Sequence, residues 1–405
     1  MAKTVLISGA SIAGPALAFW LHKWGFRPTV VERAPGVRDG GYAIDVRGAA
    51  VEVADRMGIL EEVRAAHTGM RGLSLISADG RSFADIDMSQ LGSEDADVEL
   101  MRGTLARLIH ERTDGIEYLF GDSIVDLTER PGGVEVTFEH HPPREFDLVV
   151  GADGLHSNVR RLAFGPEGNF RRHLGYHVSI FSTENALGLD RWTALFNEPG
   201  RMAGSYRAKT DRGAKGILSF TSPELTFDPR DAAGQLALLD EAFSGMGGIV
   251  PQLLSAAREA PDFYFDSVSQ IRLDRWSRER VVLLGDAGYC PSPLSGQGSS
   301  LALVGACVLA AELRDSEGNH SLAFDRYENR MRDFVRRNQK LAPDGAKILI
   351  PKTRTSLHLR NGLLRLAPHL PGAITFSKKT RTAANAIDLP PRGVSGRSDP
   401  TSQHR

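Results

Sequence analysis

Two glycines five positions apart define a turn near the start of the chain. Gly9 and Gly14 flank Ser11 in the run Gly9-Ala10-Ser11-Ile12-Ala13-Gly14, which fits a Gly-x-Gly-x-x-Gly frame except at its middle position. In such a turn the middle glycine lets a pyrophosphate approach the backbone, and the outer glycines serve the tight turn and close helix packing. Serine is a mild replacement because its N–H and hydroxyl can still donate to phosphate. Taken alone, the motif indicates a nucleotide site and simple strand–helix packing about equally.

An acidic residue follows this turn at a distance that could serve the same nucleotide. Glu32 ends a second short apolar run, eighteen residues beyond Gly14. A carboxylate at the end of that strand can accept hydrogen bonds from the hydroxyls of an adenosine ribose. The alternative is a solvent-exposed strand end with no ligand.

Two later segments share one pattern, an apolar run that stops at a Gly/Asp turn. They read FDLVVGADG over residues 146–154 and VVLLGDAG over residues 281–288. Turns of this kind bring a carboxylate, here Asp153 or Asp286, and bare backbone to the carboxyl end of a sheet, where open α/β folds bind ligands. By itself, Asp153-Gly154 is also an ordinary turn, with Ser157 as a possible helix N-cap and Arg160-Arg161 as a solvated pair.

The elements that must position these turns can be read from periodicity. Residues 4–8 and 29–32 favour buried strands, and residues 13–24 favour a helix between them, which makes one strand–helix–strand unit. Residues 300–313 favour a buried helix, 322–341 an exposed Arg-rich helix and 355–370 an amphipathic one. Residues 178–220 are β-rich with glycine turns, so together with residues 73–88 they predict a second sheet inserted into the first domain.

Composition narrows the class of protein. The 405 residues are 41% hydrophobic and 24% charged, and 49 basic residues nearly balance 50 acidic ones. This balance gives no reason to expect nucleic acid or a membrane as partner, so we expect a small-molecule ligand and a monomer or homodimer. Two cysteines, Cys290 and Cys307, and no visible targeting segment favour a cytoplasmic location. The histidines show no metal-ligand spacing, so no metal is expected.

Three motifs in this order resemble those of a known family. They are "GASIAG", "VVGADGLHSNVR" and "LLGDAGYCPSPLSGQGSSLAL", within residues 3–335. Their order and separation are similar to those of single-component FAD-dependent monooxygenases, which include para-hydroxybenzoate hydroxylase, tetracycline-inactivating monooxygenases and polyketide-tailoring hydroxylases. The resemblance implies FAD as cofactor, NADH or NADPH as electron donor and O2 as co-substrate.

The same resemblance implies a set of cofactor-binding residues. The turn at Gly9 would hold the ADP half of FAD, Asp286 would bond the ribityl chain, and the glycine-rich loop after Pro293 would place N–H groups against the flavin pyrimidine. That loop also suits a reduced flavin on physical grounds, because a helix N-terminus favours negative charge. The whole implied set is Gly9, Ser11, Ile12, Ala13, Gly14, Glu32, Arg33, Arg47, Arg102, Asp153, Gly154, Arg160, Asp286, Pro293, Gly296, Gln297 and Gly298.

Three positions depart from the family pattern. Tyr289 stands where relatives often have histidine, Ser300 where they have asparagine, and Gly305 where they have an acidic residue. We expect these changes to alter the surroundings of the cofactor rather than the carboxylate of Asp286. They leave reaction rate and substrate geometry open.

The expected fold is α/β, with a Rossmann-like FAD-binding domain, an inserted β-sheet substrate domain and C-terminal helices. We expect the FAD-binding domain at residues 1–72, 89–175 and 271–340, the substrate domain at 73–88 and 176–270, a helical segment at 341–389 and a disordered tail at 390–405. The implied activity is hydroxylation of an aromatic or polyketide-like molecule through a flavin C4a-hydroperoxide, with no catalytic side chain assigned. The alternatives are an FAD oxidase or dehydrogenase on the same fold, and a catalytically silent flavin-binding homologue.

Overall fold

The strands expected around the first motif lie side by side in one sheet. The computed structural model of the chain describes residues 3–38, 40–87, 97–366 and 375–392. Its six-stranded sheet has the order β17-β18-β11-β1-β2-β7, and every neighbouring pair is parallel except β17 with β18. The strands are β1 (Thr4–Ser8), β2 (Arg27–Glu32), β7 (Glu117–Phe120), β11 (Leu148–Gly151), β17 (Ser277–Arg278) and β18 (Val281–Leu283).

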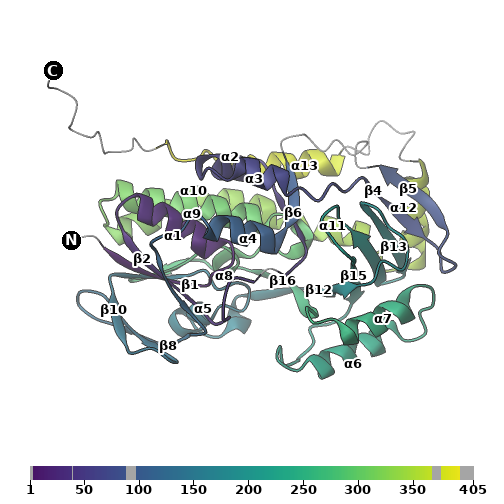
Figure 1. Cartoon of the computed structure of the whole chain (residues 1–405), viewed down its shortest axis with the longest axis horizontal. Helices are drawn as coiled ribbons and strands as arrows, with labels where there is room; N and C mark the ends of the chain where they lie inside the picture. The colour runs from purple at the N-terminus through teal and green to yellow at the C-terminus, as the bar shows by residue number, and fades with distance from the viewer. Residues whose placement is uncertain (1–2, 39, 88–96, 367–374, 393–405) are drawn as a thin grey trace, which may run out of the picture.

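Helices cover both faces of this sheet, which explains why its strands read as continuous apolar runs. In β1, Val5, Leu6 and Ile7 are all fully buried, as expected for a parallel strand with helices on either side. Figure 1 shows α1 (Ala13–Lys23), α9 (Gly298–Asp315) and α10 (His320–Gln339) above the sheet, with α5 (Asn158–Phe164) below it. A separate three-stranded sheet of β8 (Ile124–Glu129), β9 (Val134–Phe138) and β10 (Arg144–Phe146) lies beside α5.

The expected degree of burial is confirmed for α9 but not fully for α10, the long helices that begin within and after the third motif. Helix α9 is buried along nearly its whole length, as the sequence predicts. Helix α10 is not simply exposed, because Phe324, Tyr327, Met331 and Phe334 form a buried stripe against α9. The expectation of an exposed helix is therefore wrong for one of its faces, since many arginines conceal an apolar stripe at helical spacing.

The second sheet has seven strands in the order β16-β12-β15-β14-β13-β4-β5. All neighbours are antiparallel except β13 and β4, which run parallel. The strands are β4 (Gly72–Ile76), β5 (Ser82–Asp87), β12 (Arg171–Thr183), β13 (Trp192–Glu198), β14 (Arg201–Arg207), β15 (Ala214–Thr221) and β16 (Tyr264–Ile271). Residues 73–87 of the first expected segment therefore share a sheet with the 178–220 segment, and residue 88 lies outside the described residues. The exact limits of the two domains stay a prediction.

Each face of the seven-stranded sheet has its own apolar cluster. Helices α6 (Ala232–Phe243) and α7 (Val250–Glu259) cover one face, around Phe181, Leu218 and Phe265. The other face carries Val178, Ile217 and Met202 in the strand register, and it packs against α11 (Ala342–Leu349). Figure 1 shows α6 and α7 below this sheet and α11 between the two domains.

Short elements connect the two sheets. A two-stranded antiparallel sheet pairs β3 (Ala43–Val46) with β6 (Val98–Met101) between the domains. The remaining elements are α2 (Ala49–Arg56), α3 (Leu60–Ala65), α4 (Arg102–His110), η2 (Glu167–Asn169), α8 (Asp286–Tyr289), η3 (Pro293–Ser295), α12 (Arg354–Leu366) and α13 (Thr375–Ala384). Helix α12 packs on β5 and β13, and α13 packs on α10.

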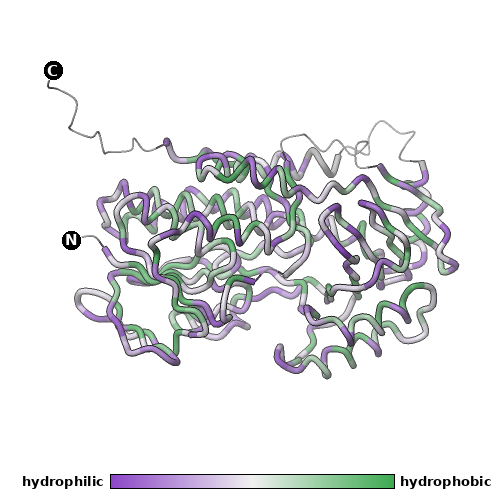
Figure 2. Tube along the Cα trace, viewed as in Figure 1, coloured by the Kyte–Doolittle hydropathy of each residue, from purple (hydrophilic) through white to green (hydrophobic). Residues whose placement is uncertain are grey.

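Hydropathy follows this layering. Figure 2 shows hydrophobic residues concentrated along the strands of the parallel sheet, with hydrophilic residues along the outer turns. No helix among the described residues combines the length and apolar character needed to cross a membrane. The expected helix over 355–370 is present as α12 up to residue 366. Most of the tail expected to be disordered, residues 393–405, lies outside the described residues.

Candidate cofactor site

The first turn joins β1 to α1 with almost no space between them. The N–H of Gly9 donates to the carbonyl of Val31 at 2.8 Å, and a Cβ added to Gly14 would lie 1.9 Å from the carbonyl oxygen of Gly9. Helix α1 begins at Ala13, with Ile12 as an N-cap that offers no side-chain bond and with no acidic residue in the first turn. The helix therefore presents bare N–H groups and its positive end, which suits an anion.

Ser11 occupies the middle position of this turn and contacts an expected cofactor residue. Its hydroxyl oxygen accepts a hydrogen bond of 3.0 Å from the Arg102 guanidinium. Arg102 is the first residue of α4, and its backbone N–H donates to the carbonyl of Tyr42. The structure therefore brings Arg102 to the beginning of α1, although ninety-one residues separate it from Ser11.

Glu32 is held in place by backbone groups on both sides. Its carboxylate accepts hydrogen bonds from the N–H of Ala10 at 2.8 Å and of Ala34 at 2.9 Å, one on each oxygen. The side chain is buried, so the alternative of a solvent-exposed strand end is wrong. Each oxygen keeps a free lone-pair direction for a ligand hydroxyl. Arg33, the next residue, is exposed.

Asp153 organises the second turn from inside the protein. Its carboxylate accepts hydrogen bonds from the Ser157 hydroxyl at 2.5 Å and from the N–H groups of Asn158 and Val159 at 2.9 and 3.0 Å. Burial raises the pKa of Asp153, and these bonds partly oppose that rise. Asp153 thus binds the first N–H groups of α5, whose N-cap is Ser157 as the sequence indicates, while Gly154 has open space at its α-carbon. A contact of this pair with a cofactor stays a prediction.

Arg160 links the second turn to the third. The side chain is fully buried and donates to the carbonyls of Leu155 and Ala287 at 2.7 and 2.9 Å and to Glu167 at 3.1 Å. A solvated charge pair is therefore wrong for Arg160 but fits Arg161, which is exposed. Arg160 therefore holds the backbone of the second and third turns together through the carbonyls of Leu155 and Ala287.

His156 is a structural residue of this region that sequence reasoning missed. Its Nδ1 lies 3.1 Å from both carboxylate oxygens of Glu167, and its Nε2 lies 3.0 Å from Oδ2 of Asp266 on β16. Hydrogen bonds to Asp266 and Glu167 raise the pKa of His156 to about 9. The imidazolium therefore ties the second motif to the seven-stranded sheet. Only the position of His156 within "DGLHSNVR" could have drawn attention to it.

Asp286 lies where the first and third motifs meet. It is the first residue of α8, and a Cβ added to Gly298 at the start of α9 would lie 3.7 Å from its Oδ1. Burial raises the pKa of Asp286, while the Cys290 thiol and the charge of Arg102 oppose that rise. This carboxylate is thus close to both Arg102 and the start of α9.

The proline and glycine loop leads into α9 with its N–H groups uncapped. The carbonyl of Pro291 accepts a bond from Gln270, which ties the buried end of the loop to β16, while Pro293 is exposed. The backbone N–H of Gln297 is already used, because it donates to the Ser295 hydroxyl at 3.1 Å. Helix α9 has no side-chain cap and no acidic residue in its first turn. The N–H groups from Gly298 onward are therefore the ones available to an anionic partner.

Arg47 reaches the same loop from β3. A Cβ added to Gly296 would lie 3.9 Å from Nη1 of Arg47. The N–H of Arg47 donates to the hydroxyl of Ser300 at 3.1 Å, and that hydroxyl donates to the carbonyl of Asp45 at 3.3 Å. Ser300, one of the three departures, therefore fastens β3 to the start of α9.

The other two departures, Tyr289 and Gly305, are in contact with each other. The Tyr289 hydroxyl lies 2.9 Å from that of Tyr327, which in turn donates to the carbonyl of Leu283. A Cβ added to Gly305 would lie only 2.2 Å from the Tyr289 oxygen. Gly305 thus gives room to a larger residue at position 289, and both residues lie in the core, where burial, with help from the charge of Asp286, raises the pKa of Tyr289.

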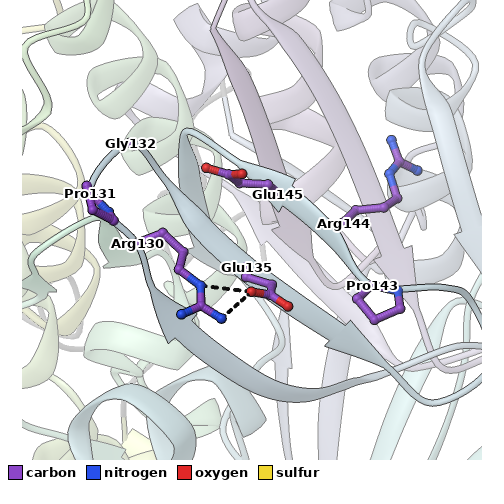
Figure 3. Close-up of a pocket in the computed structure, with 7 residues that line it drawn as sticks. All are labelled: Arg130, Pro131, Gly132, Glu135, Pro143, Arg144 and Glu145. Carbon is purple, nitrogen blue, oxygen red and sulfur yellow. Dashed lines mark hydrogen bonds and ion pairs between the residues drawn. The ribbon is translucent and has the colours of Figure 1, made fainter.

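A hollow elsewhere on the molecule is not part of this arrangement. Figure 3 shows it on the three-stranded sheet, beside the ion pair of Arg130 and Glu135. It has a volume of about 450 Å³, and no residue of the three motifs lines it. The residues around the turns fit FAD better, because α1 and α9 have uncapped N-termini, and the carboxylates of buried Glu32 and partly buried Asp286 lie beside the starts of these helices.

Comparison with known proteins agrees with this geometry. A family model described as "FAD binding domain" matches residues 2–183. An uncharacterized protein of Mycobacterium tuberculosis (strain ATCC 25618 / H37Rv) is 49% identical over 346 residues, which span 84% of this chain and 93% of that relative. A flavin-dependent monooxygenase from an unknown prokaryotic organism is 40% identical over 338 residues, 83% of this chain and 88% of the relative.

Solved structures give the same result. The crystal structure of tetracycline destructase Tet(55) matches with a TM-score of 0.83 and 36% sequence identity, over 96% of this chain and 98% of that one. The resemblance drawn from the three motifs, the α/β fold with its FAD-binding domain and the assignment as an enzyme are thereby confirmed. The chain belongs to the single-component flavin-dependent monooxygenases.

Proposed function

We propose that this monooxygenase consumes NADH or NADPH and hydroxylates an aromatic or polyketide-like small molecule. One observation carries the proposal: the third of the three loops, through η3, meets the apolar face of the seven-stranded sheet. Leu294 in η3 packs on the cluster that includes Val178 and Ile217. A substrate on that face would lie next to the loop that leads into α9.

The residues at the turns can each hold a part of FAD. The start of α1 and the guanidinium of Arg102 would hold the pyrophosphate, because both offer positive charge and N–H donors. Glu32 would accept the ribose hydroxyls, and Asp286 would accept the ribityl hydroxyls. The start of α9 would face the flavin pyrimidine, where reduction places negative charge.

The proposed substrate face is built largely from apolar side chains. The apolar cluster on this face includes Leu195, Met202 and Ile217 from three neighbouring strands, and α11 closes one side with Ala346. Such a surface favours flat apolar molecules and displaces water from the reacting atoms.

The bound flavin would supply the redox chemistry by accepting a hydride from the nicotinamide and activating dioxygen at its C4a atom. The protein's own groups would orient the ring, keep the apolar face dry and stabilise negative charge at the pyrimidine. These roles require positioned N–H groups and shape, which are what the loops provide.

The deciding test combines cofactor, donor and product. Purified protein is expected to carry FAD, to oxidise NADH or NADPH faster in the presence of substrate, and to incorporate one atom of labelled oxygen from O2 into the product. Because one structural neighbour is a tetracycline destructase, the first panel would contain tetracyclines, simpler phenols and polycyclic polyketides, with products identified by mass spectrometry.

The same assay separates the alternatives. Substrate oxidation with hydrogen peroxide as the product of O2, and no labelled oxygen in the organic product, would favour an oxidase or dehydrogenase. A yellow protein whose flavin is not reduced by NADH or NADPH without oxygen, even with the panel present, would favour a silent binder. Protein without flavin would contradict the proposal altogether.

A further inference from the structure

An acidic residue that the sequence motifs did not include lies against the loop before α9. Asp45 on β3 bonds Nη2 of Arg47 at 2.9 Å through its Oδ1. Its other oxygen would lie 3.3 Å from a Cβ added to Gly296, the same position that lies 3.9 Å from Nη1 of Arg47. The carboxylate and the guanidinium therefore both border the backbone of Gly296.

The backbone of this pair is fixed to α9. Ser300 accepts the N–H of Arg47 and donates to the carbonyl of Asp45, so one side chain in the first turn of α9 secures both residues. Since Gly296 leads into the same helix two residues earlier, Asp45 and Arg47 cannot shift along β3 without breaking a contact with α9. Their distance from the start of α9 is thus set by the fold.

Asp45 has one basic neighbour, Arg47, and two acidic neighbours, Glu99 and Asp97. The side chain of Asp45 is 17% exposed, Glu99 is its partner across the β3–β6 ladder, and Asp97 lies 3.9 Å from Nε of Arg47. Burial raises the pKa of Asp45 to about 6, with Arg47 opposing the rise and the charges of Glu99 and Asp97 adding to it. The Arg47 guanidinium thus contacts two carboxyl groups, Asp45 and Asp97, and Asp45 is bound to it more closely.

We propose that Asp45 is a positioning residue that holds Arg47 at the Gly296 loop, and that this pair sets how readily the bound flavin accepts negative charge. The proposal rests on the proposed FAD function. While Asp45 is ionised, the pair has no net charge and leaves stabilisation of an anionic flavin to the start of α9. When Asp45 is neutral, the pair carries one positive charge beside the same loop.

Sulfite is a suitable probe because it adds to oxidised flavin and leaves negative charge on the ring, as reduction does. The measurement is the dissociation constant of sulfite for FAD-loaded protein at pH 8 and at pH 5, from the loss of flavin absorbance. The Asp45→Asn variant is expected to bind sulfite about tenfold more tightly than wild type at pH 8, which corresponds to one pKa unit of interaction. At pH 5 wild-type Asp45 is mostly protonated, so the two proteins should become alike.

Two further variants separate positioning from simple damage. Arg47→Gln is expected to weaken sulfite binding at pH 8 and at pH 5, because it removes the positive member of the pair. Asp97→Asn is the matched control, since it removes a carboxylate that also contacts Arg47 but is more exposed, at 31%. We expect a smaller change for Asp97→Asn than for Asp45→Asn. The ionisation of sulfite itself cancels in the ratio between variants at each pH.

A readout without flavin checks the ionisation of Asp45. Because its pKa is raised by folding, its charge destabilises the folded state as pH rises through about 6. The flavin-free Asp45→Asn protein should therefore melt at a higher temperature than wild type at pH 8, and the gain should shrink at pH 5.

The proposal would be overturned by equal sulfite affinity of wild type and Asp45→Asn at pH 8, or by a difference that persists at pH 5. In either case yellow, FAD-loaded variants would show that the proposed function stands while this inference fails. Proteins that bind no FAD at all would overturn both.

Discussion

The two large sheets of this enzyme carry their functional residues in different ways. In the six-stranded parallel sheet, the expected cofactor residues lie in turns at strand ends, around Gly9, Asp153 and Asp286. In the seven-stranded sheet, the apolar residues next to the cofactor loops, such as Val178 and Ile217, lie in the middle of strands on one face. In the proposed function, one sheet would bind mainly through backbone at its strand ends, and the other through side chains on its surface.

This difference predicts different responses to substitution. A turn that binds through backbone groups depends on close approach, so adding a single carbon can abolish the site. A face that binds through apolar side chains changes its fit gradually, because one methylene in a pocket contributes about 1–3 kcal/mol. Changes in the first sheet should thus act on FAD, and changes in the second on substrate.

The strongest effect is expected for Gly14→Ala. Its Cβ would meet the Gly9 carbonyl at 1.9 Å, a backbone contact that neither element can relieve. We expect a loss of FAD binding and of about 3 kcal/mol of folding free energy, at the upper end of overpacking costs. Flavin content and thermal unfolding measure both.

Gly36→Ala is the control for that variant, because an added Cβ at Gly36 meets no heavy atom within 4 Å. It should retain flavin and unfold near the wild-type temperature. If Gly14→Ala remained yellow and stable, the close packing of β1 on α1 would not be what the first motif requires.

Asp286→Asn should separate binding from stability. Removing the carboxylate charge should weaken FAD binding by about tenfold to a hundredfold, the size of a hydrogen bond to a charged group. Since burial raises the pKa of Asp286, its charge disfavours the folded flavin-free protein above its unfolded pKa. The flavin-free variant should therefore melt higher than wild type at pH 7. A decrease in both properties would contradict the proposed role.

Ile217→Ala tests the second sheet. Ile217 is partly exposed on the face beside Leu294, so the variant should raise KM for the organic substrate about tenfold and leave FAD content unchanged. Leu218→Ala, on the opposite face and fully buried, should instead cost about 2–5 kcal/mol of stability with little change in KM. Equal effects of the two on KM would refute the assignment of the faces.

The smallest effect is expected where the two sheets are joined. The pKa of His156 rises on folding from 6.5 to about 9, so its stabilisation is complete below pH 6.5 and is lost as pH rises through 9. The wild-type melting temperature should therefore fall between these pH values. His156→Asn should melt lower at pH 6 and show a flatter profile. An unchanged profile would mean that the bonds to Asp266 and Glu167 add nothing.

The functional residues of the first sheet are more predictable from the sequence than those of the second, for a physical reason. The turns at Asp153 and Asp286 each have a strand, a glycine and a carboxylate within a few consecutive residues, and the turn at Gly9 is followed at a typical spacing by Glu32, so local spacing is sufficient to identify them. The strands of the second sheet are visible as β-rich segments, but the face of each strand depends on register. That register joins segments as distant as β4 and β13.

Contacts across long separations were the least predictable part of the site. The bond between Arg47 and Ser300 joins residues 253 positions apart, and that between His156 and Asp266 joins residues 110 apart. No periodicity or motif encodes such pairs, so Asp45 and His156 were missed. The partial burial of α10 was missed because arginine composition outweighed its apolar stripe.

The contact between Tyr289 and Gly305 restricts how this core can change over evolutionary time. With a Cβ at position 305 only 2.2 Å from the Tyr289 oxygen, a substitution of Gly305 would have to wait until position 289 had become smaller. The permitted order of changes is therefore one-way, and a sequence with tyrosine and a larger residue 305 together should be rare among descendants. Transferring Tyr289 of α8 into a relative with a larger residue at position 305 of α9 would require both positions to be exchanged at once.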